Sequence, residues 1–329
     1  MINVAMLSYW HVHAKGYAKE VAQSGIARIA AVWDELPERG KQEADALGVR
    51  WCARLEDALS SEIDAVVVNA PTDMHEQVIT AAARAGKHIF TEKVLTTTVA
   101  SARRIVAEIA SAGVKFCISL PQRGKPQHLF IKKAADSGAL GRVYLVRMRN
   151  AHSGSTDGWL PEHFYDPVAC GGGAMMDLGA HPMYLISWLL GEPVRINSMF
   201  TSVTGRAVED NAVCTIEFRD GAIGVSETGF VSKASPAALE VYGDQGTAMV
   251  CGPEGSVYLR EAGADAFRLV APGELPAHAP KPIAQFLSAV AGSGQILYGI
   301  DDAIALTRLM EGAYRAHREG RTVSFSEIG

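Results

Sequence analysis

The fold is set by two nearby stretches, VVVNAPTDMH at residues 66–75 and KHIFTEK at residues 87–93. In each stretch a short apolar run stops at polar residues, and a helical pattern lies between the two runs. This order predicts two parallel strands joined by a helix. Because parallel strands end on the same edge of a sheet, Pro71 and Lys93 are expected where open α/β sheets bind ligands.

The same alternation of strand and helix extends on both sides of these stretches. Strands are expected at residues 3–7, 29–33, 63–69, 87–90 and 114–119, and helices at 15–23, 37–47, 73–85 and 99–111. Such alternation is typical of a doubly wound parallel sheet with right-handed crossovers. We therefore predict that residues 1–122 form an α/β domain.

The character of the sequence changes after about residue 122. A helix is expected at residues 126–137, and seven later segments, beginning with 143–149, read as strands in which apolar and polar residues alternate. The pair Asp220-Gly221 predicts a hairpin turn between two of them. Helices at 282–291 and 301–319 are expected to complete the chain. We predict that residues 123–329 form an α+β domain with a large, mainly antiparallel open sheet.

Composition narrows the classes of partner. The 329 residues include 31 basic and 36 acidic side chains, and the net charge of −5 gives no reason to expect nucleic acid or an anionic membrane. No apolar run reaches the ~18 residues of a membrane span, and we predict a cytoplasmic protein. The five cysteines have no Cys-x-x-Cys spacing, so we expect reduced thiols and no zinc site.

The first strand–helix loop lacks the expected glycines. A dinucleotide-binding fold places Gly-x-Gly-x-x-Gly here, and the corresponding positions hold Ser8, Trp10 and His13. The helix N-terminus and the Ser8 hydroxyl could still bind a phosphate. Alternatively, Trp10, His11 and His13 only plug the loop against the sheet.

Asp34 follows the second expected strand, where a carboxylate can accept hydrogen bonds from the adenosine ribose and repel a 2′-phosphate. This position favours NAD over NADP. Two alternatives stay open: Asp34 could cap only the helix that begins near Pro37, and Arg39 could neutralise a phosphate.

The segment GGGAMMDLGAHP at residues 171–182 is the second informative stretch. If Asp177 and His181 lie on one helix, their spacing puts them on the same face, and the glycines before them let a loop pass close to a ligand. Pro182 should then kink that helix. A satisfied core histidine is the alternative.

These three motifs, Asn-Ala-Pro-Thr-x-x-His75, Glu92-Lys93 and Asp177-x-Gly-x-His181, together resemble the Gfo/Idh/MocA family of sugar and polyol oxidoreductases over nearly the whole chain. The glycine loop departs from the family pattern. Val94 stands where the family usually has proline, so a cis peptide bond after Lys93 is not expected. Tyr184 occupies the place of a frequent second aspartate.

The resemblance implies a Rossmann dinucleotide-binding domain at residues 1–122 and a substrate-binding and oligomerisation domain at 123–329. Lys93 and His181 would be the acid/base pair, and Asp177 would bind a substrate hydroxyl or orient the histidine. The residues expected to contact the cofactor are Ser8, Trp10, His11, Val12, Asp34, Asn69, Ala70, Pro71, His75, Glu92 and Lys93. Those expected to contact the substrate are Arg123, Asn150, His152, Trp159, Asp177 and Tyr184.

We therefore predict an NAD(P)-dependent oxidoreductase that transfers a hydride between the cofactor and a secondary alcohol of a sugar, polyol or inositol-like substrate. NAD is preferred, no metal is expected, and the C-terminal sheet is expected to form a homodimer or homotetramer. The alternatives are an NAD-using glycosidase that works by transient oxidation and elimination, and a non-catalytic ligand-sensing regulator. A metal-assisted lyase using His11 and His13 is more remote, because no carboxylate lies on the same element.

Overall fold

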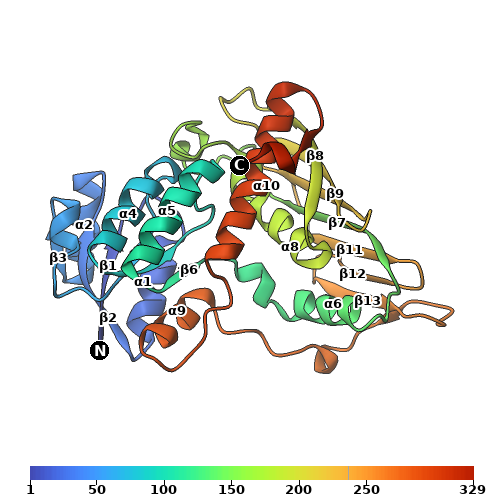
Figure 1. The fold of residues 1–329 in the computed structure, drawn as a ribbon, viewed down its shortest axis with the longest axis horizontal. Helices are drawn as coiled ribbons and strands as arrows, with labels where there is room; N and C mark the ends of the chain where they lie inside the picture. The colour runs from blue at the N-terminus through green and yellow to red at the C-terminus, as the bar shows by residue number, and fades with distance from the viewer. Residues whose placement is uncertain (236) are drawn as a thin grey trace. The chain divides into compact units, whose positions relative to one another are not determined.

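The computed structural model describes residues 1–235 and 237–329 and divides into two compact units (Figure 1). The first comprises Met1–Leu120 with Pro280–Thr307, and the second comprises Pro121–Ala279 with Arg308–Gly329. The first division thus falls close to the expected boundary after residue 122. Residues 280–307, which the sequence analysis assigned to the second domain, belong to the first unit because helix α9 (Pro282–Val290) packs on its sheet and on its first helix.

The first unit carries a six-stranded parallel sheet in the order β3-β2-β1-β4-β5-β6. The structure describes every residue of this unit. In chain order its elements are β1 (Ile2–Leu7), α1 (Ala14–Gln23), β2 (Ala27–Trp33), α2 (Pro37–Leu47), β3 (Arg50–Cys52), α3 (Leu55–Ala58), β4 (Ala65–Val68), η1 (Thr72–Met74), α4 (His75–Arg84), β5 (His88–Thr91), α5 (Val99–Ala112), β6 (Phe116–Ile118), α9 and the start of α10 (Ile300–Glu319). This confirms the doubly wound parallel sheet. The sequence analysis missed β3 and α3, which are too short to show a clear period.

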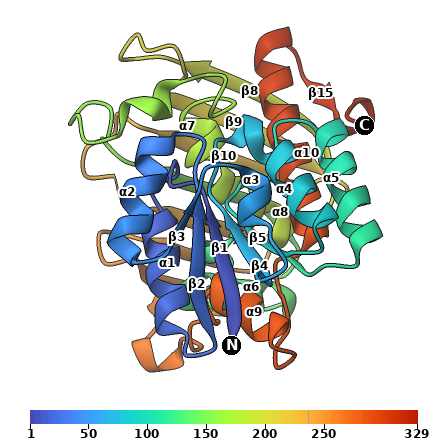
Figure 2. The ribbon, with the colours of Figure 1, turned by 90° about the vertical axis from the view of Figure 1, so that its left-hand side faces the viewer.

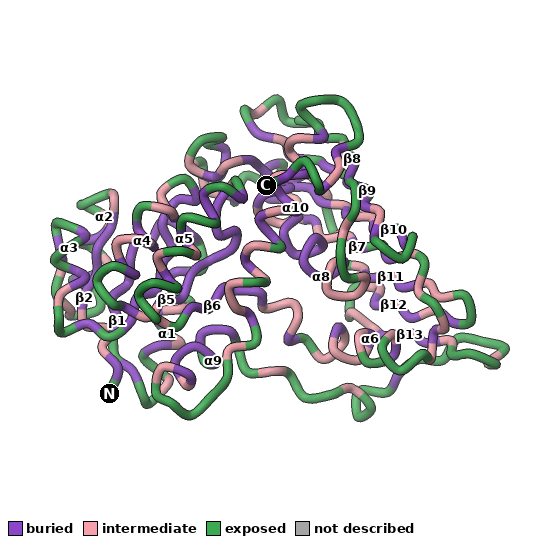
Figure 3. The backbone as a smooth tube through the Cα atoms, in the orientation of Figure 1, coloured by how far each residue is buried: buried purple, intermediate pink, exposed green. Residues whose placement is uncertain are grey.

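Helices cover both faces of this sheet (Figure 2). Apolar residues of α1, α2 and α9 form one core cluster with β1, β2 and β4, while α4 packs on β4 and β5 and contacts α5. A central strand covered on both faces has no polar side, and all four residues of β4 are buried (Figure 3). This is why the strand reads as the continuous run Ala65-Val66-Val67-Val68.

The second unit is built on a mixed sheet, which over the described residues has nine strands in the order β14-β13-β12-β11-β7-β10-β9-β8-β15. Every adjacent pair is antiparallel except β7 with β10. Its strands are β7 (Val143–Ala151), β8 (Pro193–Thr201), β9 (Asn211–Phe218), β10 (Ile223–Gly229), β11 (Ala238–Gly243), β12 (Thr247–Cys251), β13 (Ser256–Arg260), β14 (Arg268–Leu269) and β15 (Val323–Ser324). The mainly antiparallel sheet is confirmed.

Helices lie against one face of this second sheet. They include α6 (Pro126–Asp136), α7 (Ala174–Asp177), α8 (Ala180–Leu190) and the end of α10. The second unit also contains the short 3-10 turns η2 (Pro121–Gly124), η3 (Glu162–Tyr165), η4 (Pro272–Glu274) and η5 (Phe325–Glu327). Helix α8 packs on β7 and β10. The expected hairpin is present between β9 and β10, because Gly221 has a φ of +85° and the Phe218 N–H donates to the Ala222 carbonyl at 2.9 Å.

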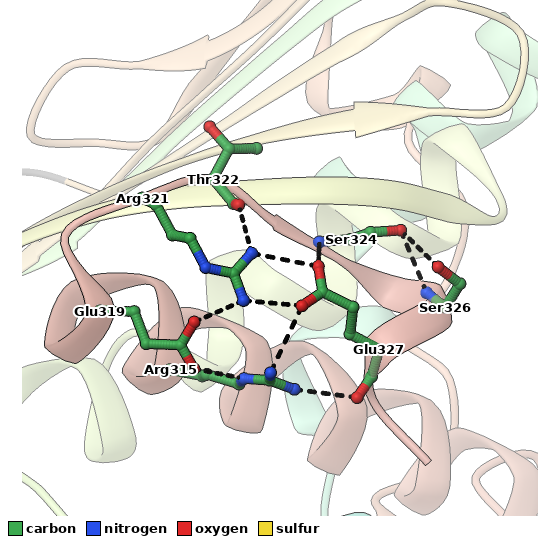
Figure 4. A network of polar contacts seen from close by, with 7 residues as sticks. All are labelled: Arg315, Glu319, Arg321, Thr322, Ser324, Ser326 and Glu327. Carbon is green, nitrogen blue, oxygen red and sulfur yellow. Dashed lines mark hydrogen bonds and ion pairs between the residues drawn. The ribbon is translucent and has the colours of Figure 1, made fainter.

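The C-terminal tail is tied to the end of α10 by charged groups (Figure 4). The Glu327 carboxylate accepts hydrogen bonds from Arg321 at 2.6 and 3.1 Å and from the Ser324 N–H at 3.0 Å. The Arg315 guanidinium donates to the Glu327 carbonyl at 2.9 Å and to Glu319 at 2.6 Å. These exposed pairs fix the direction of the tail but contribute modestly to stability.

All five cysteines are free thiols, as expected, and four of them are buried. In the part of the chain that the structure describes, no helix has both the length and the apolar character needed to cross a membrane.

A close contact between α2 and the end of β2 gives a test of this packing. A Cβ atom added at Gly40 would lie 2.6 Å from the Asp34 Cβ, so α2 must move away for any larger residue. We expect Gly40→Ala to lower the free energy of unfolding by about 1–3 kcal/mol, measured by urea denaturation. The control is Gly16→Ala in α1, where an added Cβ meets nothing within 4 Å. Equal stability of Gly40→Ala and the wild type would contradict this packing.

Candidate active site

The turn after β1 keeps the backbone shape of a glycine loop without a glycine. Ser8 is buried and has a φ of +76°, in the left-handed region that glycine normally occupies. Its N–H donates to the Trp33 carbonyl at 2.6 Å, and its Oγ accepts the Trp10 N–H at 3.0 Å. The side chain thus satisfies a backbone group inside the turn. A serine in this conformation costs on the order of 1–2 kcal/mol, which these contacts must offset.

The remainder of the loop is anchored to the end of β4. The His11 N–H donates to the Asn69 carbonyl at 3.1 Å, and the His13 N–H donates to the His11 Nδ1 at 3.2 Å. Trp10 and His11 are buried, as the plug interpretation expects, whereas Val12 is 52% exposed. The loop therefore combines a buried base with an exposed tip.

Asp34 is held by several hydrogen bonds at this edge. Its buried carboxylate accepts the backbone N–H groups of Tyr9 and Leu36, both at 2.8 Å. The Arg39 guanidinium donates to both oxygens, at 2.7 and 2.9 Å, and also pairs with Glu35. Asp34 therefore holds the first loop, the start of α2 and a cation at once.

The end of β4 presents a buried amide that lacks partners. Asn69 is fully buried, and neither its side-chain oxygen nor its side-chain nitrogen has a hydrogen-bond partner among the residues that the structure describes. Ala70 and Pro71, which follow it, are also buried. Unpaired buried polar atoms in a native fold need an explanation, and a bound ligand is one.

His75 joins the loops after β4 and β5. Its Nε2 lies 3.0 Å from the Ala70 carbonyl oxygen, and its Nδ1 lies 3.0 Å from the carbonyl oxygens of both Val94 and Leu95. Burial lowers the pKa of this imidazole. The peptide bond between Lys93 and Val94 is cis, so the expectation of a trans bond was wrong. That expectation used only the missing proline.

The Glu92 carboxylate is the centre of a buried polar network. Its Oε1 lies 2.7 Å from the His13 Nδ1 and accepts the Tyr17 hydroxyl, and its Oε2 accepts the Lys93 N–H at 2.9 Å. The Tyr17 hydroxyl is also 2.7 Å from the Ser119 Oγ. The sequence analysis missed Tyr17 and Ser119. The spacing of His13 and Tyr17, one turn apart at the start of α1, was the available signal for Tyr17.

The network keeps Glu92 ionised. Burial by itself raises the pKa of this carboxyl, but the neighbouring His11, His13 and Lys93 outweigh it and hold the pKa well below its usual value. Burial, with the charge of Glu92 added, raises the pKa of Tyr17 well above its usual value. The pair is therefore a buried anion that accepts a hydrogen bond from a neutral phenol.

Three side chains could together hold a metal ion, because the ligand atoms of His11, His13 and Glu92 lie within 4.8 Å of one another. The sequence analysis found no carboxylate near the two histidines, because Glu92 comes from a different element. The hydrogen bonds described above already use the His11 Nδ1 and the Glu92 Oε1 as acceptors. A metal ion would have to compete with these bonds for the same lone pairs. The expectation of no metal stays a prediction.

Asp177 and His181 lie on two separate helices, so the single kinked helix that we considered is not formed. Asp177 ends α7 and His181 is in the first turn of α8, with Gly179 before it. Pro182 lies in that first turn, where the missing N–H is tolerated. The Leu178 carbonyl accepts the His181 N–H at 3.2 Å and the Asn150 side chain at 3.3 Å.

The His181 ring is held by a tyrosine on the same helix. Its Nδ1 lies 2.9 Å from the Tyr184 hydroxyl, which accepts the Gln122 N–H at 3.1 Å. Because that oxygen already accepts one hydrogen bond, it can donate its own proton to Nδ1, leaving the proton of a neutral ring on Nε2. Tyr184, at the position of the missing aspartate, thus orients the histidine.

Aromatic contacts organise the other expected substrate residues of the second unit. The His152 ring stacks on Phe230, with the two ring centroids 5.1 Å apart. The Trp159 ring centroid lies 4.5 Å from that of His152, and the Trp159 side chain is 56% exposed. Burial lowers the pKa of His152 although Asp177 opposes this. Arg123 lies over the Trp188 ring at 5.1 Å.

The glycines before Asp177 serve close packing inside the second unit. A Cβ at Gly172 would lie 2.0 Å from the Tyr314 hydroxyl, and one at Gly173 would lie 2.1 Å from the Glu209 carbonyl oxygen. The Glu209 Oε1 accepts the Gly173 N–H at 2.9 Å and the Tyr314 hydroxyl at 2.5 Å. Glu209 and Tyr314 are the supporting residues that sequence reasoning missed, because they lie far along the chain.

A doubly wound parallel sheet, a left-handed turn after β1 and a carboxylate after β2 define a dinucleotide-binding Rossmann domain. Residues 5–120 match the family model described as an oxidoreductase family with an NAD-binding Rossmann fold, and residues 128–249 match the Gfo/Idh/MocA C-terminal domain. The chain belongs to the Gfo/Idh/MocA family of oxidoreductases.

Curated relatives include inositol dehydrogenases. The chain is 31% identical over 199 residues to an inositol 2-dehydrogenase of Rhizobium meliloti, a match that covers 60% of this chain and 58% of that protein. It is 30% identical over 251 residues to inositol 2-dehydrogenase 1 of Saccharopolyspora erythraea, covering 73% and 70%.

A similar solved structure is that of GenD2 from gentamicin A biosynthesis in complex with NAD. It superposes with a TM-score of 0.82 at 26% identity and covers 98% of this chain and 96% of that one.

The lowered pKa of Glu92 predicts a pH dependence of stability. Its folded-state pKa lies below the unfolded value of about 4.3, so the stabilisation is complete above that pH and is lost as the pH falls through the folded value. We expect Glu92→Gln to lower the free energy of unfolding at pH 7 by about 1–3 kcal/mol. The difference from the wild type should shrink as the pH falls below about 4.

The measurement is urea unfolding between pH 7 and pH 3, followed by tryptophan fluorescence. The control is Glu62→Gln, an exposed position in the same unit. A wild-type advantage that stays constant over this range would rule out the lowered pKa.

Proposed function

We propose that the protein is an NAD-dependent dehydrogenase that oxidises a secondary hydroxyl of a sugar, polyol or inositol-like substrate. Support comes from the family and from relatives named as inositol 2-dehydrogenases. The two fused regions match the cofactor-binding and C-terminal family models over 5–120 and 128–249. We assign cofactor binding to the first unit and substrate binding to the second.

The observation that carries this proposal is the buried, unpartnered amide of Asn69 beside the left-handed turn at Ser8. Both belong to the sheet edge where a Rossmann domain receives a dinucleotide, so the residues present fit that cofactor. Ser8, Trp10, His11 and Val12 would hold the phosphate side. Asn69, Ala70, Pro71, Glu92 and Lys93 would hold the nicotinamide side.

Oxidation of a secondary alcohol requires a base for the hydroxyl proton, and a bound nicotinamide supplies the hydride acceptor. We assign the proton to Lys93, with His181 as its acid/base partner and Asp177 as a substrate ligand. The Glu92 carboxylate accepts the Lys93 N–H at 2.9 Å, and this bond fixes the main chain that carries the amine. His75, whose two ring nitrogens lie 3.0 Å from three carbonyl oxygens, is assigned a positioning task.

The remaining substrate contacts are assigned to the second unit. Asn150 and His152 lie at and just beyond the end of β7, and the exposed indole of Trp159 is suited to stacking on an apolar sugar face. Arg123 and Tyr184 lie close in the structure, because Tyr184 accepts the N–H of the neighbouring Gln122.

We expect Lys93→Ala to lower kcat with inositol or a hexose by about 100-fold or more while NAD still binds, because only the proton acceptor is removed. Activity is followed by NADH absorbance and NAD binding by fluorescence. The control is Lys115→Ala, an exposed lysine before β6 in the same unit. His181→Asn should reduce kcat in the same direction. Full activity of Lys93→Ala would remove the lysine from the mechanism.

We further propose that the open face of the second sheet joins copies of the chain. Helix α8 covers the face that includes Gly224, because the Ile186 side chain lies against this glycine. On the opposite face Met199 is paired with Val213, and both are exposed. Exposed apolar side chains on adjacent strands support an interface between subunits.

Replacing Met199 and Val213 by lysine together should convert a dimer or tetramer into a monomer, because like charges cannot be buried against each other across an interface. Light scattering after size exclusion measures the mass. Val203→Lys, an exposed valine just after β8, is the control. An unchanged mass of the double variant would exclude this face.

A further inference from the structure

We propose that a cavity at the start of helix α6 binds a small hydroxylated acid, such as a sugar acid or a phosphorylated polyol. The cavity is formed within the second unit and has a volume of about 240 Å³. Its lining comes from η2, the first turn of α6, the strands β7, β11 and β12, and the turn between β12 and β13. Binding there needs no dinucleotide, so the site is independent of the proposed oxidation.

The first turn of α6 offers backbone donors to this cavity. Lys125 precedes the helix, Pro126 is its first residue, and no side chain of the described residues caps this end. At an uncapped end the N–H groups of Gln127 and His128 have no carbonyl partner within the helix. Both residues line the cavity. The positive end of an 11-residue helix therefore borders a space that can hold an anion.

Lys125 adds a cation at the exposed mouth of the same cavity. Burial lowers the pKa of this amine, and no carboxylate of the described residues offsets that shift. Glu254 also lines the cavity, but it is exposed on the turn after β12 and does not act on the Lys125 pKa. An acid group bound between Lys125 and the helix end would supply the missing opposite charge.

His128 sets the second chemical requirement, a hydroxyl. Its side chain is only 6% exposed, and its Nδ1 lies 2.7 Å from the Gln122 carbonyl oxygen. Burial lowers the pKa of this imidazole to about 4, so the ring is neutral at pH 7. The ring proton is then on Nδ1, because a carbonyl oxygen can only accept. Nε2 has no partner among the described residues and remains an acceptor for a hydroxyl in the cavity.

The rest of the wall is apolar and limits the size of the ligand. Met148, Leu239 and Val250 are buried side chains that line the cavity and can contact a short carbon chain. The volume is below the ~300–1,000 Å³ of sites for drug-sized ligands. The cavity therefore suits a compact molecule with an acid group at one end and a hydroxyl beside it.

The test is isothermal titration calorimetry of the full chain with D-glycerate and with glycerol 3-phosphate. We expect at least one of these acids to bind with a Kd below about 1 mM, and the tighter one identifies the acid group as carboxylate or phosphate. Glycerol lacks the acid and propionate lacks the hydroxyls, so both should bind about tenfold more weakly or worse. Failure of both acids to bind, or equal binding of glycerol or propionate, would overturn the proposal.

Two variants place the binding at this cavity. Lys125→Met removes the cation, and Gln127→Glu adds a carboxylate that suits the helix end but repels an acid. Each should weaken binding of the preferred acid by about tenfold or more, with folding checked by thermal unfolding. The control is Lys133→Met, an exposed lysine in the last turn of α6, which should bind like the wild type. Wild-type affinity in Lys125→Met or Gln127→Glu would place the acid elsewhere and overturn the assignment.

Discussion

The pairing of β4 with β5 is the constraint on which the cofactor edge depends. Val68 is opposite Thr91, and the ladder continues past the strands because the Glu92 N–H donates to the Val68 carbonyl at 3.1 Å. One parallel register therefore brings Asn69 beside the Glu92-Lys93 pair. The Asn69 carbonyl in turn receives the loop after β1. Three segments far apart in sequence meet through backbone hydrogen bonds, and side-chain chemistry is added to a fixed frame.

Two buried carboxylates then stabilise the loops around that frame. Asp34 holds the first loop and α2, and Glu92 holds the start of α1 and the main chain at Lys93. Each anion is compensated by backbone N–H donors and by a neighbouring cationic or hydroxyl group, which a buried charge requires. This arrangement explains how the loop does without its glycines: Ser8 takes the left-handed turn, and Asp34 accepts the adjoining N–H.

Much of the fold could be predicted because its elements have strong periods. The limits of α2, β11 and β12 agree with the expected ranges, and the Asp220-Gly221 hairpin is present. Short elements such as β3 were missed, because they show no clear period. The helix α9 was assigned to the wrong unit, because the apolar face of a helix does not indicate which sheet it will pack against. Pro182 was read as a kink, whereas it lies in the first turn of a new helix.

The sequence by itself determined the family, the order of strands and helices, and the residue types at Asp34, Glu92, Lys93 and His181, because these follow from local period and motif spacing. Only the tertiary structure decided which of them still have hydrogen-bonding capacity. Asp34 is saturated by Arg39 and two backbone groups, and Glu92 is joined to Tyr17. These hydrogen-bond partners are brought together by packing between segments that are distant along the chain. A local sequence pattern therefore cannot predict how many lone pairs of each carboxylate remain without a donor.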